Sequence, residues 1–162
     1  MRTWVQIGLI AGVLVGCSGK SEDDSAGPGD TGTSSPDAVP CAAVADAGLA
    51  MTPGNTPDTT APAIMDMSAP YTIELSADAG GWVRLVLPEA GSYTIHTGFA
   101  GVLRGLWTDT GEYPLGIARS NEVCPGDIPE AFTVTVTEPS TFYMQLGPLS
   151  AIYFWVYVQP EA

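Results

Sequence analysis

Apolar and polar residues alternate along most of the second half of the chain, and this period of two predicts β-strands. Each alternating run is short, and turns that contain Gly or Pro separate most of the runs. The runs that predict strands are 71–75, 82–87, 92–96, 102–107, 132–137, 141–146 and 152–159. No segment keeps the helical spacing of apolar residues over more than two turns. The Ala-rich residues Cys41 to Gly48 are expected to form one or two helical turns at most.

Seven short strands joined mainly by tight turns are typical of an all-β sandwich. We therefore expect residues 41–162 to form a single antiparallel, jelly-roll-like β-sandwich of about seven to eight strands. Residues 49–70 carry four prolines and are expected to form an irregular lead-in to the first long strand.

The first 16 residues have the pattern of a bacterial secretory signal. Arg2 is followed by an uncharged apolar run from Thr3 to Gly16, which is too short to span a bilayer core. The run ends in Leu14-Val15-Gly16-Cys17, which resembles the lipobox of bacterial lipoproteins. The resemblance implies cleavage before Cys17, a diacylglyceryl thioether on its sulfur and, because Ser18 follows, anchoring in the outer membrane of the cell envelope.

Residues 18–40 consist mainly of Ser, Gly, Asp and Pro and contain no aromatic residue. A segment of this composition cannot bury enough apolar surface to order itself, so we expect a flexible tether. The predicted organisation is a signal peptide over 1–16, a lipidated cysteine and tether over 17–40, and the sandwich over 41–162.

The charge of the chain excludes some classes of partner. The sequence has 162 residues with 5 Lys and Arg against 18 Asp and Glu, a formal net charge of −13. Nothing here could neutralise a run of phosphates, so we expect no nucleic acid as a partner. An anionic lipid surface would also repel the chain, so contact with the membrane is expected only through the lipid anchor.

Two cysteines remain once Cys17 carries lipid. Cys41 and Cys124 would lie in an oxidising compartment, where an even pair of cysteines predicts a disulfide. The bond would close a loop of more than 80 residues and attach the start of the domain to a late loop.

Residues with catalytic or metal-binding chemistry are sparse. His96 is the only histidine, and we expect it to be hydrogen-bonded or solvent-facing rather than catalytic. Without Cys-x-x-Cys or paired histidines, no zinc site or cofactor is expected. Carboxylates in or near turns leave a structural calcium ion open as an alternative, although no defined loop spacing is present: Asp78, Asp109, Glu112, Glu122, Asp127 and Glu130.

The tripeptide Asp-Thr-Gly occurs at Asp30 and at Asp109, as in aspartic proteases. That chemistry needs two such aspartates facing each other, each after a buried strand, and no apolar strand precedes Asp30. An ordinary β-turn at Asp109 is the favoured interpretation. A small hydrolase is kept only as the second alternative.

The last predicted strand carries three aromatic rings on one face. Tyr153, Trp155 and Tyr157 alternate with apolar residues that point into the core, which places the rings in a row. Such a row could bind a glycan or a peptide. The favoured interpretation is that both faces of the strand are buried, one in the core and the other under residues 49–70. Trp82 and Trp107 are expected to cap the core.

The turn pattern resembles a known family. Residues 87–95, Leu87-Pro88-Glu89-Ala90-Gly91-Ser92-Tyr93-Thr94-Ile95, are similar to the bacterial pre-peptidase C-terminal domain, as are the strand and turn at 105–111 and the ending at 138–146. The resemblance covers about residues 70–158. It implies a jelly-roll-like sandwich that serves as a non-catalytic appendage on secreted proteases and on envelope lipoproteins.

Taken together, these features predict an outer-membrane-anchored lipoprotein whose non-catalytic β-sandwich has a binding or structural role at the cell envelope. Its partner would be a glycan or an envelope protein. The first alternative is a glycan- or peptide-binding module that uses Tyr153, Trp155 and Tyr157.

Overall fold

The computed structural model of the protein describes most of the chain beyond the predicted signal and tether. The described residues are 37–45, 48–76, 79–150 and 153–161. Cys17, the signal peptide and most of the predicted tether lie outside these segments. No helix in the described segments is long and apolar enough to cross a membrane.

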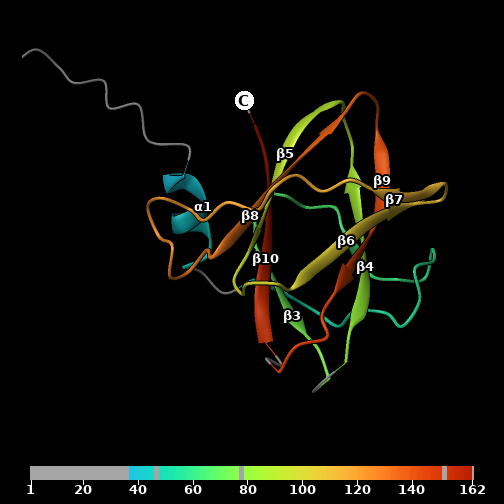
Figure 1. Cartoon of the computed structure of the whole chain (residues 1–162), viewed down its shortest axis with the longest axis horizontal. Coiled ribbons are helices and arrows are strands. Elements are labelled where there is room, and N and C mark those ends of the chain that lie inside the picture. The colour runs from blue at the N-terminus through green and yellow to red at the C-terminus, as the bar shows by residue number, and fades with distance from the viewer. Residues whose placement is uncertain (1–36, 46–47, 77–78, 151–152, 162) are drawn as a thin grey trace, which may run out of the picture. The chain divides into compact units, whose positions relative to one another are not determined.

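The described part of the chain is an all-β sandwich of ten strands with one short helix, which confirms the predicted fold class (Figure 1). The elements are α1 (Ala38–Ala43), β1 (Leu49–Met51), β2 (Ala63–Ile64), β3 (Tyr71–Glu74), β4 (Gly81–Leu87), β5 (Gly91–Thr97), β6 (Leu103–Thr108), β7 (Gly111–Tyr113), β8 (Glu130–Val136), β9 (Ser140–Leu146) and β10 (Tyr153–Pro160). All seven strands predicted from alternation are present, as β3, β4, β5, β6, β8, β9 and β10.

The strands form two five-stranded sheets, which we name after their central strands. The β10 sheet has the order β1-β3-β10-β5-β8, and the β9 sheet has the order β2-β4-β9-β6-β7. The long strands pair antiparallel, but β1 pairs with β3 and β2 pairs with β4 in parallel. The sheets are therefore mixed, and the prediction of a purely antiparallel sandwich with seven to eight strands is wrong in this respect.

The three additional strands are too short to produce an alternating pattern. β1 and β2 lie within residues 49–70, which were predicted to be irregular, and they contain three and two residues. Their pairing depends on hydrogen bonds to β3 and β4 or to residues beside them. Leu49 N–H donates to the Pro70 carbonyl, and Arg84 N–H donates to the Pro62 carbonyl. Neighbouring long strands, and not local sequence, thus create these elements.

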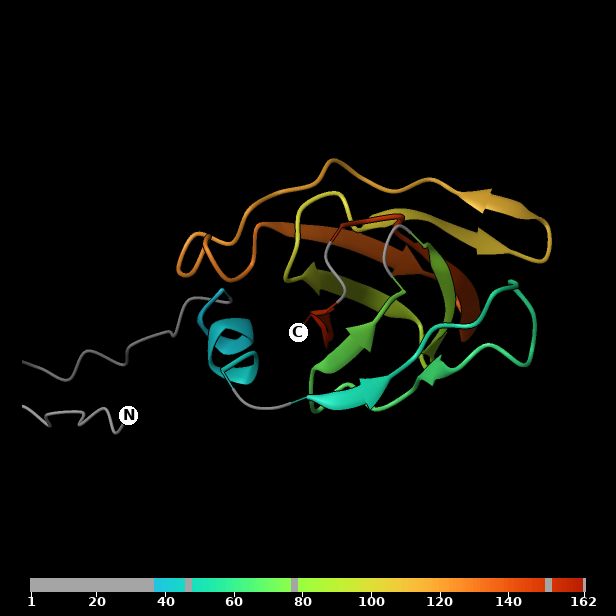
Figure 2. The same ribbon diagram turned by 90° about the horizontal axis from the view of Figure 1, so that it is seen from below.

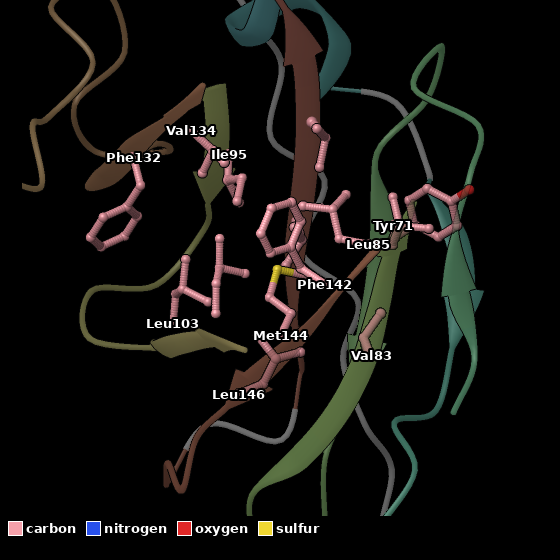
Figure 3. Packing of buried hydrophobic residues seen from close by; sticks show 14 of the residues in the cluster. Tyr71, Val83, Leu85, Ile95, Leu103, Phe132, Val134, Phe142, Met144 and Leu146 are labelled. Carbon is pink, nitrogen blue, oxygen red and sulfur yellow. The ribbon is translucent and has the colours of Figure 1, made fainter. Parts of the chain in front are cut away.

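The inner faces of the two sheets form one hydrophobic core (Figure 3). Along β4, buried residues alternate with partly exposed ones, so that Val83 and Leu85 point inward. They pack in the same layer as Phe142 of β9 and Ile95 and Val134 of the β10 sheet. Complete burial of each such side chain stabilises the fold by about 1.5–3 kcal/mol. The outer faces of the two sheets do not belong to this core.

The helix α1 lies outside the sandwich, beside the segment between β7 and β8; Figure 2 shows the two side by side at one end of the domain. The helix begins at Ala38, earlier than the predicted helical turns from Cys41. Asp37 and Pro40 are buried. The packed part of the chain therefore begins before the predicted boundary at residue 41. Hydrogen bonds of Asp37 and the Cys41–Cys124 disulfide hold α1 against the domain.

Candidate functional site

The aromatic row predicted on β10 is open at one end only. Tyr153 is 58% exposed, and its hydroxyl donates a hydrogen bond to Glu74 Oε1 at 3.1 Å. Trp155 is partly buried and packs so closely on Gly98 that a Cβ there would lie 2.5 Å from its Nε1. Tyr157 is only 6% exposed. The three rings are thus on one face, as predicted, but they do not form an open row.

The helix α1 contacts β10, the strand that carries the row. The disulfide between Cys41 and Cys124 ties α1 to the segment between β7 and β8, which confirms the predicted pairing. Residues around α1 therefore lie against β10, a contact that the interpretation of a face covered by residues 49–70 did not include.

Asp37 fixes the start of α1. Its carboxylate accepts one hydrogen bond from Arg119 Nη1 and one from the backbone N–H of Glu122, each at 2.9 Å. Its carbonyl accepts a third from Asn121 Nδ2 at 3.0 Å. The Glu122 N–H and, next, the Arg119 guanidinium hold the pKa of Asp37 below its ordinary 3.8. The network and the disulfide hold α1 against one loop.

His96 lies on the face of the aromatic row and is 2% exposed. Its ring stacks on Tyr157 with centroids 6.0 Å apart and planes inclined by 21°. The ring is buried, so the expectation of a solvent-facing histidine is wrong. Burial, and then the positive charge of Arg119, lowers its pKa from 6.5 to about 4, against the opposing effects of Gln159 and two nearby carboxylates.

A concave aromatic surface lies instead on the outer face of the β9 sheet. It is a groove of about 540 Å³, lined by Pro57, Trp82, Trp107, Thr108, Asp109, Tyr143 and Gln145. We call it the aromatic groove. The strand register assembles it: Trp82 of β4 pairs with Gln145 of β9, and Trp107 of β6 pairs with Tyr143 of β9. Three strands that are not consecutive in sequence therefore bring three aromatic rings to one place.

The two indoles of the groove are inclined to each other. The ring centroids of Trp82 and Trp107 are 6.5 Å apart, and the ring planes meet at 67°. Gly105 pairs with Gln145 and carries no side chain. A Cβ at Gly105 would lie 3.2 Å from Trp107 Nε1, so the glycine makes room for the indole on this face. Trp107 therefore packs on the backbone of its own strand and remains in the wall of the groove.

The polar groups of the groove lie around these rings. Thr108 and Asp109 come from the end of β6 and the turn that follows it, and Gln145 comes from β9. The turn is closed by a hydrogen bond from Thr108 Oγ1 to the carbonyl of Gly111 at 3.0 Å, and Gly111 adopts a φ of 137°, which favours glycine. The Asp-Thr-Gly tripeptide here forms a β-turn, as the favoured interpretation predicted.

The carboxylates considered for calcium have other positions. Asp109 lines the aromatic groove, Glu130 accepts a hydrogen bond from the Gly101 N–H at 2.7 Å, and Asp78 lies outside the described residues. Within segments 37–45, 48–76, 79–150 and 153–161, no group of three or more His, Cys, Asp or Glu side chains is placed to hold a metal ion.

The fold and the groove together define an all-β sandwich with an aromatic surface site. A comparison of the sequence with known protein-family models finds no match, and no curated protein is detectably similar. The likeness to the pre-peptidase C-terminal domain therefore stays a prediction from turns and strand positions.

The sequence does contain a signal for the groove. Trp82, Trp107 and Tyr143 each occupy an outward position in an alternating strand, next to residues that point into the core. A single aromatic residue at an outward strand position does not by itself indicate a site. The pairing of β4 and β6 with β9 brings the three rings together, and this pairing is known only from the structure.

Proposed function

We propose that this protein binds a glycan, without converting it, in the aromatic groove of the β9 sheet. One observation carries the proposal: Trp82, Trp107 and Tyr143 converge in a groove of about 540 Å³ with only a few polar side chains around them. Binding sites for small molecules are mostly apolar and have a few placed polar groups. The electron-rich faces of aromatic rings attract the C–H groups on the faces of pyranose rings.

The charges in the groove support binding without hydrolysis. Asp109 is the only carboxylate among the lining residues, whereas most glycosidases use a pair of carboxylates on either side of the scissile bond. His96 is buried and belongs to the outer face of the other sheet. The residues that line the groove therefore suit the binding of a glycan better than acid–base catalysis.

We further propose that the protein acts at the bacterial cell envelope through a lipid on Cys17. The support is the lipobox-like Leu14-Val15-Gly16-Cys17, and acyl chains on one cysteine anchor a protein firmly. A Cys17→Ser variant should move from the membrane fraction to the soluble envelope fraction. A variant that remains in the membrane fraction would contradict the anchor. Separation of inner from outer membrane tests the destination expected from Ser18.

A matched pair of tyrosines tests the groove. Tyr143 belongs to the aromatic groove, whereas Tyr153 lies on the other sheet and is more exposed. Binding of the purified protein to an array of immobilised glycans should be lost in Tyr143→Ala and kept in Tyr153→Ala. Loss only in Tyr153→Ala would instead assign binding to the β10 sheet, and retention in both variants would remove the groove as the site.

A further inference from the structure

Resting on the proposed function, we infer the chemical class of the glycan from the shape and charge of the aromatic groove. The groove takes an uncharged glycan, as one or two pyranose units of a single accessible chain. It does not take an acidic polysaccharide or the flat face of a packed, insoluble one.

The inclined rings exclude a flat ligand. A packed polysaccharide surface can stack only on rings that share a plane. The planes of Trp82 and Trp107 meet at 67°, so at most one of the two can lie against such a surface. With centroids only 6.5 Å apart, both rings can instead contact the same sugar, one at its face and the other at its edge. The two rings thus form an angled wall that fits a short length of one chain.

The indole of Trp107 presents carbon to the groove. Its Nε1 is buried and has no hydrogen-bond partner among the described residues, and it lies toward Gly105. The part of Trp107 that lines the groove is therefore the apolar ring. An apolar ring stacks on C–H groups of a sugar, while Thr108, Asp109 and Gln145 provide donors and acceptors for hydroxyl groups at the margin.

The charge of the groove disfavours acidic sugars. Asp109 is the only charged residue in the lining, and the chain as a whole carries −13. A uronate or sulfate group in the groove would lie near the Asp109 carboxylate, and no Lys or Arg lines the groove to neutralise it. Arg84 is the nearest cation by register, since it pairs with Tyr143. Its Nε donates to the Ala61 carbonyl at 3.0 Å, and Arg84 does not line the groove.

The size of the groove agrees with a short ligand. A volume of about 540 Å³ falls within the range of about 300–1,000 Å³ for small-molecule sites. Pro57, from the loop before β2, closes part of the margin. The site therefore suits one or two sugar units of one chain and not a broad surface.

The test uses the full chain in a zwitterionic detergent without a sugar headgroup, so that the detergent does not occupy the groove. Isothermal titration calorimetry is done with soluble neutral oligosaccharides built from glucose, mannose, xylose or N-acetylglucosamine, and with oligogalacturonate as the acidic member. Sedimentation with crystalline cellulose and chitin tests flat surfaces. The variants are Trp107→Ala, Trp107→Phe and Tyr143→Ala, with Tyr153→Ala as the control outside the groove.

We expect at least one neutral oligosaccharide to bind, with affinity that changes less than twofold between low and physiological salt. Trp107→Ala and Tyr143→Ala should each weaken binding at least tenfold, Trp107→Phe should weaken it less, and Tyr153→Ala should leave it unchanged. Trp107→Phe and Tyr143→Ala keep the test decisive if Trp107→Ala does not fold. Oligogalacturonate and the crystalline polysaccharides should not bind.

The remaining outcomes separate this inference from the proposed function. If oligogalacturonate alone binds, with salt-dependent affinity that Tyr143→Ala removes, the groove binds glycans but the inferred class is overturned. The same holds if only the crystalline polysaccharides bind and Tyr143→Ala removes that binding. If no carbohydrate of either kind binds, the proposed function fails and the inference fails with it.

Discussion

Lowering the pH from about 6.5 to about 4 should destabilise the folded domain through one side chain, His96. It is the only histidine of the chain, and burial lowers its pKa from 6.5 to about 4. Between these pH values the unfolded chain binds a proton at this residue and the folded chain does not. The free energy of unfolding therefore falls as the pH falls through this window, and the contribution of His96 levels off below about pH 4.

The magnitude follows from the difference between the two pKa values. At about 1.4 kcal/mol per pH unit, the range from 6.5 to about 4 corresponds to a loss of about 3.5 kcal/mol. Burial of the ring is the main cause of the low pKa, and the charged groups around the ring modify the size of the shift. Arg119 disfavours a second positive charge, Asp37 and Glu161 favour it, and the face of Tyr157 stacks on the imidazole. A typical domain is stable by about 5–15 kcal/mol, so the loss is measurable.

The assay is urea unfolding, followed by circular dichroism at several values between about pH 7 and pH 4.5, with wild type and His96→Gln. The wild type should lose stability across the window, and the variant, which cannot take up the proton, should lose much less. Asp37 does not interfere, because its pKa is lowered from 3.8 and its contribution is lost only at lower pH. Equal slopes in both proteins, or an NMR titration of His96 with a midpoint near 6.5, would refute the reasoning.

Two further predictions concern the attachment of α1. Removing the disulfide with Cys41→Ala and Cys124→Ala should lower the free energy of unfolding by roughly 4–5 kcal/mol in the chain-entropy model, because the bond spans 83 positions; a urea midpoint equal to that of the oxidised wild type would contradict this. Replacing Arg119 by Ala should raise the pKa of His96, since the guanidinium is the second cause of its low value. The same NMR titration measures the change, and an unaltered midpoint would show that Arg119 does not act on the imidazole.

The long strands could be predicted because a two-layer sandwich buries one face of each strand. Alternation in segments such as 132–137 follows directly from that arrangement. The short strands β1 and β2 could not be predicted in the same way, because pairing with β3 and β4 creates them. The mixed character of both sheets follows from these two parallel pairs and was missed for the same reason.

The candidate site was harder to predict because it depends on contacts between distant residues. The sequence places Tyr153, Trp155 and Tyr157 on one face correctly. It does not show that α1 lies against β10, since the Cys41–Cys124 bond and the Asp37 network hold α1 through a loop that is distant in sequence. Tyr143, on the other sheet, likewise meets its aromatic neighbours only through the register of three non-consecutive strands.

The most direct test of the glycan groove compares the indole N–H signals of Trp82, Trp107 and Trp155 by NMR during titration with the neutral oligosaccharide that binds best. The groove predicts that the signals of Trp82 and Trp107 move with saturation at a common affinity, while the signal of Trp155, on the other sheet, stays in place. Movement of Trp155 alone would contradict the account and return the binding site to the aromatic row on β10.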